Sequence, residues 1–268
     1  AGELQVDCGA VRKRDALQAR NGYLAVEREP DRVSHFGLGL ISSNGVPGND
    51  AFTKILLHMD GSNGGTTFTD IAAGAANSHA WTPTNAVTST GTKKFGTAAL
   101  ETTAGFITTS DDSDFTLGSN DFALDFWINL NGFSGSFNLL GQSDAAANIS
   151  SQSIMMSLVG GVLRATFQTL SATQAITGAT NINGTSTFKH VAVSKIGTTV
   201  RLFLDGVQDA TGTLTNANMQ DGTGAWSIGR IGAITSLPST AFLDEFRLSV
   251  GTARGYSANF TPPSGPYI

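Results

Sequence analysis

The chain has 268 residues, with 16 Lys and Arg against 21 Asp and Glu, which gives a formal net charge of −5. This balance argues against a nucleic-acid-binding protein, because phosphate recognition needs a concentrated excess of Lys and Arg. A single cysteine, Cys8, excludes an internal disulfide and a cysteine-based metal cluster. No apolar run reaches the roughly 18 to 20 residues of a transmembrane helix, and the first residues lack the apolar core of a signal peptide, so we expect no membrane insertion.

The first 50 residues differ in composition from the rest of the chain. They carry 13 charged side chains, whereas the remaining 218 residues carry only 24. We expect a mixed-charge stretch from Val11 to Arg20 to contain one or two helical turns, and a turn-rich hinge follows at residues 42–50. Segments of about 40 residues rarely fold without disulfides, metals or partners. We therefore expect residues 1–50 to be an anchoring arm and hinge, and residues 51–268 to form the main domain.

The main domain is rich in short strand patterns separated by turn residues. Apolar residues occupy every second position from Phe122 to Leu130, which predicts a half-buried strand. The dipeptides Gly160-Gly161 and Asp205-Gly206 each separate two strand patterns and suit two-residue hairpin turns. The other expected strands are Ile154–Val159, Val162–Phe167, Phe188–Lys195, Thr199–Leu204, Ala225–Ile231 and Phe242–Val250. Many short strands of this kind predict an all-β protein, an antiparallel β-sandwich or jelly roll with an N-terminal extension.

Eight segments of the main domain follow one another in a recognisable order. They are Ile55–Gly61, Thr67–Asp70, Lys94–Leu100, Asp121–Trp127, His190–Val193, Arg201–Gly206, Ile228–Arg230 and Leu243–Arg247. Together they resemble the laminin-G-like, concanavalin A-like jelly-roll domains. The closing segment Gly251–Pro263 is similar to the tails of such domains in bacteriophage virion proteins. The resemblance covers residues 55–263 and implies a two-sheet sandwich in which the first and last strands lie close together.

Glycoside hydrolysis is the enzyme activity to test first, because this fold includes retaining glycosidases. Those enzymes need two carboxylates about 5 to 5.5 Å apart. The main domain has only two glutamates, Glu101 and Glu245, and neither has a carboxylate two or four positions away. The Glu-x-Asp-x-x-Glu pattern of related glycosidases and the Gly-x-Ser-x-Gly nucleophile motif are also absent. We therefore expect a protein that is not an enzyme, with a glycosidase as the less favoured alternative.

The last predicted strand contains an unexpected carboxylate. A strict period of two places Asp244 on the same face as Phe246 and Leu248, where a solvated carboxylate does not belong. A buried carboxylate must be protonated, hydrogen-bonded or bound to a cation. Asp244 is therefore a candidate metal ligand.

A second carboxylate, Asp60, ends the first strand of the predicted sandwich and is followed by oxygen-bearing residues at 61–63. Oxygen ligands suit Ca²⁺, and domains similar to this one often carry one structural calcium where the first and last strands meet. We predict such a calcium site at Asp60 and Asp244, with Asp70 as a third ligand. The alternative is that Asp60 caps a turn and Asp244 accepts hydrogen bonds from the backbone.

Two further features bear on binding. The acidic run at residues 111–114 lacks the Gly and Glu of an EF-hand loop, so we expect a solvated turn. A lectin needs exposed rings on which sugars stack, and Trp81 is the candidate because it lies in a predicted loop. Trp127 and Trp226 lie within predicted strands and are expected to pack in the core or on a sheet face.

These observations favour a non-enzymatic structural protein of a bacteriophage virion. In this hypothesis residues 1–50 attach the protein to other capsid or tail proteins, and the lectin-like sandwich decorates the virion surface after synthesis in the host cytoplasm. Repeated decoration of a symmetric particle also predicts a homo-oligomer. The alternative is a carbohydrate-binding module that recognises a host-surface glycan.

Overall fold

The computed structural model describes residues 47–77, 79–103, 105–143, 152–231 and 241–268, together with two strands near the amino terminus. The chain divides into two units, Ala1–Asn44 and Gly45–Ile268. In the first unit, β1 (Leu17–Arg20) pairs antiparallel with β2 (Tyr23–Val26).

Residues 17–20 were expected to lie in a helical turn, but they form strand β1, so this prediction was wrong. The earlier part of the expected helical stretch, residues 11–16, lies outside the described residues. The sequence between the two strands is Asn21-Gly22, a dipeptide that favours two-residue hairpin turns. Within the part of the chain that the structure describes, no helix is long and apolar enough to cross a membrane.

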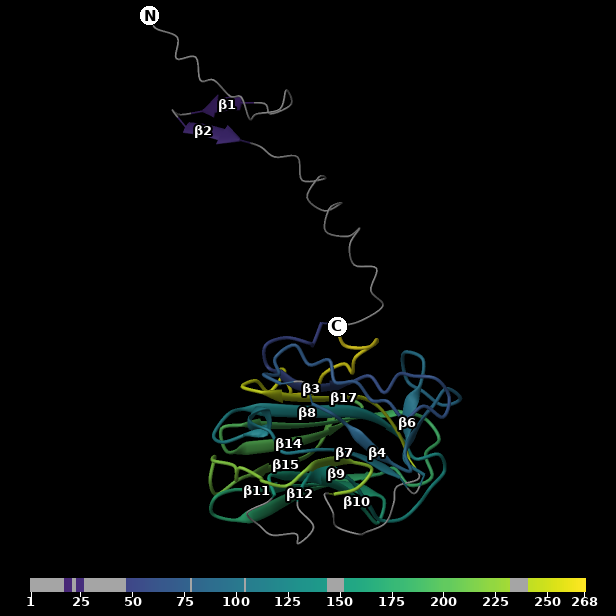
Figure 1. Cartoon of the computed structure of the whole chain (residues 1–268). Helices are drawn as coiled ribbons and strands as arrows, with labels where there is room; N and C mark the ends of the chain where they lie inside the picture. The colour runs from purple at the N-terminus through teal and green to yellow at the C-terminus, as the bar shows by residue number, and fades with distance from the viewer. Residues whose placement is uncertain are drawn as a thin grey trace, which may run out of the picture. The chain divides into compact units, whose positions relative to one another are not determined.

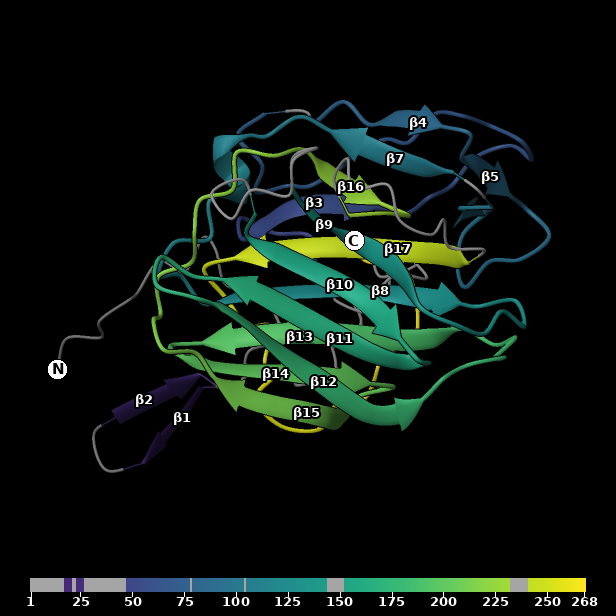
Figure 2. The ribbon, with the colours of Figure 1, turned by 90° about the horizontal axis from the view of Figure 1, so that it is seen from below.

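The second unit is a sandwich of two antiparallel sheets, and Figure 2 shows the strands of one sheet lying across those of the other. One sheet has the order β12 (Thr173–Asn181), β11 (Val162–Gln168), β10 (Ile154–Val159), β9 (Phe137–Gln142), β16 (Trp226–Ile228), β7 (Phe106–Thr109) and β4 (Thr82–Thr84). The other has the order β15 (Val207–Thr213), β14 (Thr199–Leu204), β13 (Lys189–Ile196), β8 (Phe122–Asn129), β17 (Phe242–Val250), β6 (Ala99–Glu101) and β5 (Val87–Ser89), and β3 (Thr53–Leu57) also pairs with β17. This arrangement confirms the predicted fold class, including the first and last strands of the sandwich lying side by side.

The two predicted hairpins are confirmed. Val159 pairs with Val162 around Gly160-Gly161, and Leu204 pairs with Val207 around Asp205-Gly206. All four turn residues have positive φ, from 49° at Asp205 to 92° at Gly161. These values match the type I′ geometry that fits the twist of antiparallel strands.

The hydrophobic core lies between the sheets and follows the predicted alternation. Along β8, the side chains of Phe122, Leu124, Phe126 and Ile128 belong to the main core cluster. The intervening residues of β8 are buried as well, so the expected half-buried strand is in fact buried on both faces. The outer face of this sheet must therefore be covered by another part of the chain.

The cover is the carboxy-terminal segment, residues 251–268, which lies above β17 and β8 in Figure 1. Its Tyr256 packs with Ala123, Ala192 and Phe203 in a second apolar cluster on the outer face of the eight-stranded sheet. Residues 47–50, expected to belong to the hinge, join this cover, because the Gly48 and Asn49 N–H groups both donate to the carbonyl of the last residue. The sandwich is thus closed by the first described residues and the last residues of the second unit.

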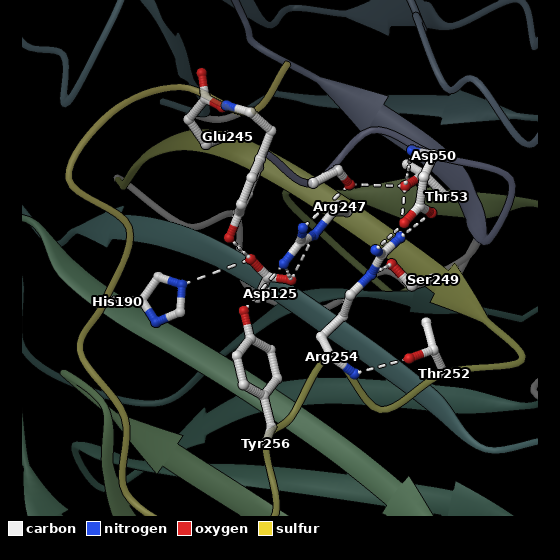
Figure 3. Close-up of polar contacts among 12 residues, drawn as sticks. Asp50, Thr53, Asp125, His190, Glu245, Arg247, Ser249, Thr252, Arg254 and Tyr256 are labelled. Carbon is white, nitrogen blue, oxygen red and sulfur yellow. Dashed lines mark hydrogen bonds and ion pairs between the residues drawn. The ribbon is translucent and has the colours of Figure 1, made fainter. Parts of the chain in front are cut away.

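A buried ion pair fixes this cover to the sheet (Figure 3). Arg247 of β17 donates from Nε to Oδ1 of Asp125 in β8 at 3.0 Å, and both side chains are buried. The other Asp125 oxygen accepts from the Tyr267 hydroxyl and lies 3.5 Å from Nε2 of His190. Arg247 also donates to the Tyr256 hydroxyl at 3.0 Å, so the carboxy-terminal segment is held by both members of the ion pair.

A second, more exposed pair holds the start of the sandwich. Arg254 donates through two nitrogens to the two carboxylate oxygens of Asp50, at 2.7 and 2.8 Å, and also donates to Thr53 and Ser249 (Figure 3). Residue 50 is therefore part of the folded sandwich and not of a free hinge.

The buried pair predicts a specific dependence of stability on pH. Burial disfavours the charged form of Asp125, but the Arg247 charge and the hydrogen bonds outweigh it and lower the pKa of this carboxyl. A lowered native pKa stabilises the fold above the unfolded pKa of about 4, and this stabilisation is lost as the pH falls through the native value. We expect Asp125→Asn to destabilise the protein at pH 7 by roughly 3–5 kcal/mol, because Arg247 is left buried and unpaired. Urea unfolding followed by tryptophan fluorescence measures this change.

The matched control is Asp205→Asn, which removes the carboxylate of a partly exposed pair with Lys189. This change should cost no more than about 1 kcal/mol. The free energy of unfolding of Asp125→Asn should also fall less steeply below pH 4 than that of the wild type. Equal losses in the two variants would contradict the role given to the buried pair.

Candidate functional site

The site predicted at Asp244 depends on an irregularity in β17. Asp244 pairs with Trp127 of β8, but the next register pair is Arg247 with Asp125, so β17 contains one extra residue. Glu245 lies in this β-bulge and has a φ of 52°. Because directly paired residues share a face, Asp244 and Arg247 both point to the outer face of the sheet.

The bulge corrects the face predicted for Asp244. Phe246 and Leu248 belong to the core between the sheets, whereas Asp244 lies on the opposite face. A period of two holds only while every residue of a strand is paired in register, and one inserted residue inverts the pattern beyond it.

Asp244 is fully buried even on the outer face, because the loop at residues 91–97 covers it. Its Oδ2 accepts from the backbone N–H groups of Lys94 at 2.7 Å and Phe95 at 3.1 Å. The Phe95 ring packs edge-on against Trp127 with ring centroids 5.8 Å apart. The carboxylate and the ring contact together hold this loop on the sheet.

Asp60 holds the other end of the same loop. Its Oδ1 accepts from the Thr97 N–H group, from the Thr97 hydroxyl at 2.9 Å and from the Ala98 N–H group at 3.2 Å. Gly96 has a φ of 58°, and a Cβ atom there would lie 2.2 Å from the same Asp60 oxygen. The glycine is therefore required for the close approach of this carboxylate.

The charge of these two carboxylates is the basis of the calcium prediction. Burial raises the pKa of Asp244 well above its usual value; the Phe95 and Lys94 N–H groups oppose this shift, and the charges of Glu245 and Asp60 add to it. A divalent cation would relieve the repulsion between Asp60 and Asp244. The backbone hydrogen bonds accepted by Asp60 and Asp244 are those expected if the two carboxylates stabilise loops without a metal ion. The calcium site itself stays a prediction.

Asp70, the predicted third ligand, has different partners. Its Oδ1 accepts from the N–H groups of Leu56 and Ala72, at 2.9 and 3.0 Å, and its Oδ2 lies 2.8 Å from Nδ1 of His79. In the described residues, Asp70 does not form a three-ligand group with Asp60 and Asp244.

The tryptophans are all buried. Trp81 is only 7% exposed and belongs to the main core, so it cannot present the exposed ring expected for sugar stacking. Its neighbours in the chain form bridges and β4, which bring the ring inside the sandwich. Trp127 and Trp226 lie in β8 and β16, and their burial confirms the packing role predicted for them.

A polar cleft of about 450 Å³ lies beside the loop that Asp60 and Asp244 hold. It is lined by Gly91, Thr92, Lys93, Lys94, Asn129, Asn131, Ser186, Thr187 and Phe188. The lining thus offers amides, hydroxyls, two lysines and one half-buried ring, and it includes no carboxylate. The Lys94 ammonium lies 3.9 Å from the Trp127 ring centroid, a cation–π contact that fixes its position at the edge of the cleft.

Sequence reasoning missed this cleft. Its walls come from three turns that are far apart in the chain, and only the fold brings them together. The turn signal Asn131-Gly132 after a strong strand marks the end of β8, where Asn129 donates to the Ser186 carbonyl at 3.1 Å. The Asn131-Gly132 signal predicts a turn, but it does not show which distant turns lie beside it in the fold.

Comparisons with known proteins agree with this architecture. The laminin G-like model of the concanavalin A-like lectin/glucanases superfamily matches residues 101–252. The chain belongs to this superfamily. A comparison with curated proteins gave no match.

Solved structures of similar fold include the binding domains of three toxins. The binding domain of Paraclostridial Mosquitocidal Protein 1 is 12% identical with a TM-score of 0.58, over 76% of this chain and 50% of that one. The binding domain of botulinum neurotoxin DC, solved in complex with SialylT, is 10% identical with a TM-score of 0.56, over 74% and 48%. The binding domain of botulinum neurotoxin serotype C1 is 10% identical with a TM-score of 0.54, over 74% and 48%. The chain therefore spans about half the length of these domains, and the likeness supports the sandwich fold.

The predicted calcium site has a direct test. Ca²⁺ at 100 times its dissociation constant should raise the free energy of unfolding by about 2.7 kcal/mol, because it binds the folded state only. Asp60→Asn should abolish this gain, which thermal melts in Ca²⁺ and in EDTA would measure. Asp221→Asn, at an exposed carboxylate that accepts from Thr116, should respond to Ca²⁺ like the wild type. Identical melting of the wild type in Ca²⁺ and in EDTA would argue for the hydrogen-bonded alternative.

Proposed function

We propose that the sandwich is a non-catalytic module that binds an acidic glycan in the polar cleft defined above. The observation that carries this proposal is the lining of the cleft. Amide and hydroxyl groups suit the hydrogen-bonding pattern of sugar hydroxyls, and Phe188 offers an apolar surface for a sugar ring. Lys93 and Lys94, with no carboxylate in the lining, favour a carboxylated or sulfated sugar over a neutral one.

The glutamates support a binding role over hydrolysis. Glu245 is buried, lies 2.7 Å from Nδ1 of His58 and accepts from the Tyr267 N–H group beneath the carboxy-terminal segment. A retaining glycosidase needs two carboxylates that both reach the substrate. Glu101 accepts from Thr103 and contributes nothing to the cleft lining.

The toxin binding domains also support a role in glycan binding, since one of them was solved in complex with SialylT. Their low identity limits that support to the fold. The acidic sugar preference rests on the lysines of this chain.

Glycan-array binding tests the proposal. Lys94→Met keeps the aliphatic stem and removes the ammonium, and Asn131→Gly removes the amide while tolerating the φ of 50° at this position. Each change should weaken glycan binding by roughly tenfold to a hundredfold, because it removes a hydrogen bond to a charged group of the glycan. Lys189→Met, outside the cleft, should bind like the wild type. The proposal fails if acidic bacterial and host polysaccharides do not bind, or if sugar is released during incubation.

A second candidate function is attachment to a bacteriophage virion, where the sandwich would be displayed in several copies. The observation that favours it is the division of the chain between Asn44 and Gly45, with a separate β1–β2 pair in the first unit. In this role the first unit binds other virion proteins and the second is the displayed surface.

Truncation separates the two units. Deleting residues 1–44 should leave a sandwich that melts within a few degrees of the full chain but no longer enters particles. Deleting residues 1–50 should lower the melting temperature further, because Asp50 and its pair with Arg254 are lost. Normal incorporation of the first truncation into particles would refute the attachment role.

A further inference from the structure

A cluster of titratable side chains lies around His79, apart from the polar cleft and the Asp60–Asp244 pair. Ligand-type atoms of His79, Asp112 and Asp114 all lie within 4.8 Å of one another. Across the residues that the structure describes, no other three His, Cys, Asp or Glu side chains meet this condition. Asp112 and Asp114 belong to the acidic run expected to be a solvated turn, but Asp114 is buried.

Asp70 fixes the orientation of the His79 ring. Its Oδ2 lies 2.8 Å from Nδ1 of His79, and its other oxygen is held by two backbone N–H groups. A carboxylate at this distance accepts a hydrogen bond from Nδ1–H, which leaves the lone pair of Nε2 pointing away from Asp70. The same carboxylate–histidine arrangement orients imidazole ligands in metal sites.

Nε2 of His79 points into the acidic cluster without a hydrogen-bond partner. The His79 side chain is only 2% exposed, and Nε2 lies 3.5 Å from Oδ2 of Asp114. An unsatisfied polar atom this deeply buried is costly in free energy. A bound cation at this point would satisfy it.

Hydrogen bonds and an ion pair also hold the two aspartates of the cluster. Asp112 caps the 3-10 helix η1 (Ser113–Phe115) by accepting from the Asp114 N–H group. Asp114 in turn accepts from the Ala76 N–H group at 2.6 Å, and Lys54 lies 3.4 Å from its other oxygen. With Asp70 included, the three carboxylates exceed the single lysine by two negative charges when His79 is neutral. One divalent cation would balance this excess.

We propose that His79, Asp112 and Asp114 bind a single divalent transition-metal ion of the Zn²⁺ type, with Asp70 as the residue that positions His79. One imidazole nitrogen and two carboxylates suit Zn²⁺, whereas Ca²⁺ and Mg²⁺ prefer oxygen ligands alone. Asp112 is partly exposed and gives the ion a path from solvent. The ion would tie His79 to the acidic run between β7 and β8.

Isothermal titration of the chelator-treated full chain with zinc chloride tests this site. The wild type should bind one zinc ion with a defined affinity. Asp70→Asn should weaken binding about 10- to 100-fold, as for a residue that positions a ligand, and Asp112→Asn should weaken it at least as much. Asp112→Asn keeps the helix cap, because Asn caps a helix as well as Asp does. Replacing the buried ligand His79 by Asn risks unfolding the protein, and Asp112→Asn tests the site without that risk.

Two controls locate the zinc. Asp111→Asn lies in the same acidic run, outside the three-ligand group, and should bind zinc like the wild type. Asp60→Asn should also leave zinc binding unchanged, which separates this site from the predicted calcium site. Substitution with Co²⁺ should give a visible absorption spectrum that Asp112→Asn alters. The proposal is overturned if the full chain binds no zinc, or if Asp112→Asn binds it as tightly as the wild type.

Discussion

The buried Asp125–Arg247 ion pair is the interaction on which the rest of the sandwich depends. It places two charges on the outer face of a sheet, where they are tolerated only because Tyr256 and Tyr267 cover them and share their hydrogen bonds. The carboxy-terminal segment that brings these tyrosines also buries the outer side of β8. Removing one charge would therefore expose a face and not only break a contact.

The Asp125–Arg247 pair and the polar cleft both depend on the same β-bulge in β17. Arg247 stands opposite Asp125 only because the bulge at Glu245 inserts one residue into β17. That bulge also turns Asp244 outward, where it accepts from Lys94 and Phe95 and fixes one wall of the polar cleft. One irregularity in one strand thus serves both the terminal cover and the cleft.

The sequence predicts the features that local chemistry decides. Alternation located β8, and the dipeptides Gly160-Gly161 and Asp205-Gly206 located two hairpins, because strand period and turn type depend on neighbouring residues. The face of Asp244 was predicted wrongly because Glu245, a residue that rarely adopts positive φ, gives no sign of a bulge. The Asn21-Gly22 signal was present, but the mixed charge before it favoured a helix.

Features that depend on distant segments could not be found in this way. Trp81 is buried because other strands enclose it, and the acidic run contains one exposed, one partly exposed and one buried aspartate within four residues. The run lies beside His79 only because the fold brings this distant residue to it. No sequence pattern around His79 or in residues 111–114 predicts that the two lie in contact.

The aspartates of the sandwich serve mainly to shape loops. Backbone N–H groups donate to Asp60 from Thr97 and Ala98, to Asp244 from Lys94 and Phe95, to Asp70 from Leu56 and Ala72, and to Asp114 from Ala76 and Asn77. Loops rich in Gly, Ser, Thr and Asn have high conformational entropy, and such contacts remove it before any ligand arrives. Rigid loops bind at lower entropic cost. Carboxylates already engaged by the backbone are poorly suited to proton transfer, because their lone pairs are occupied.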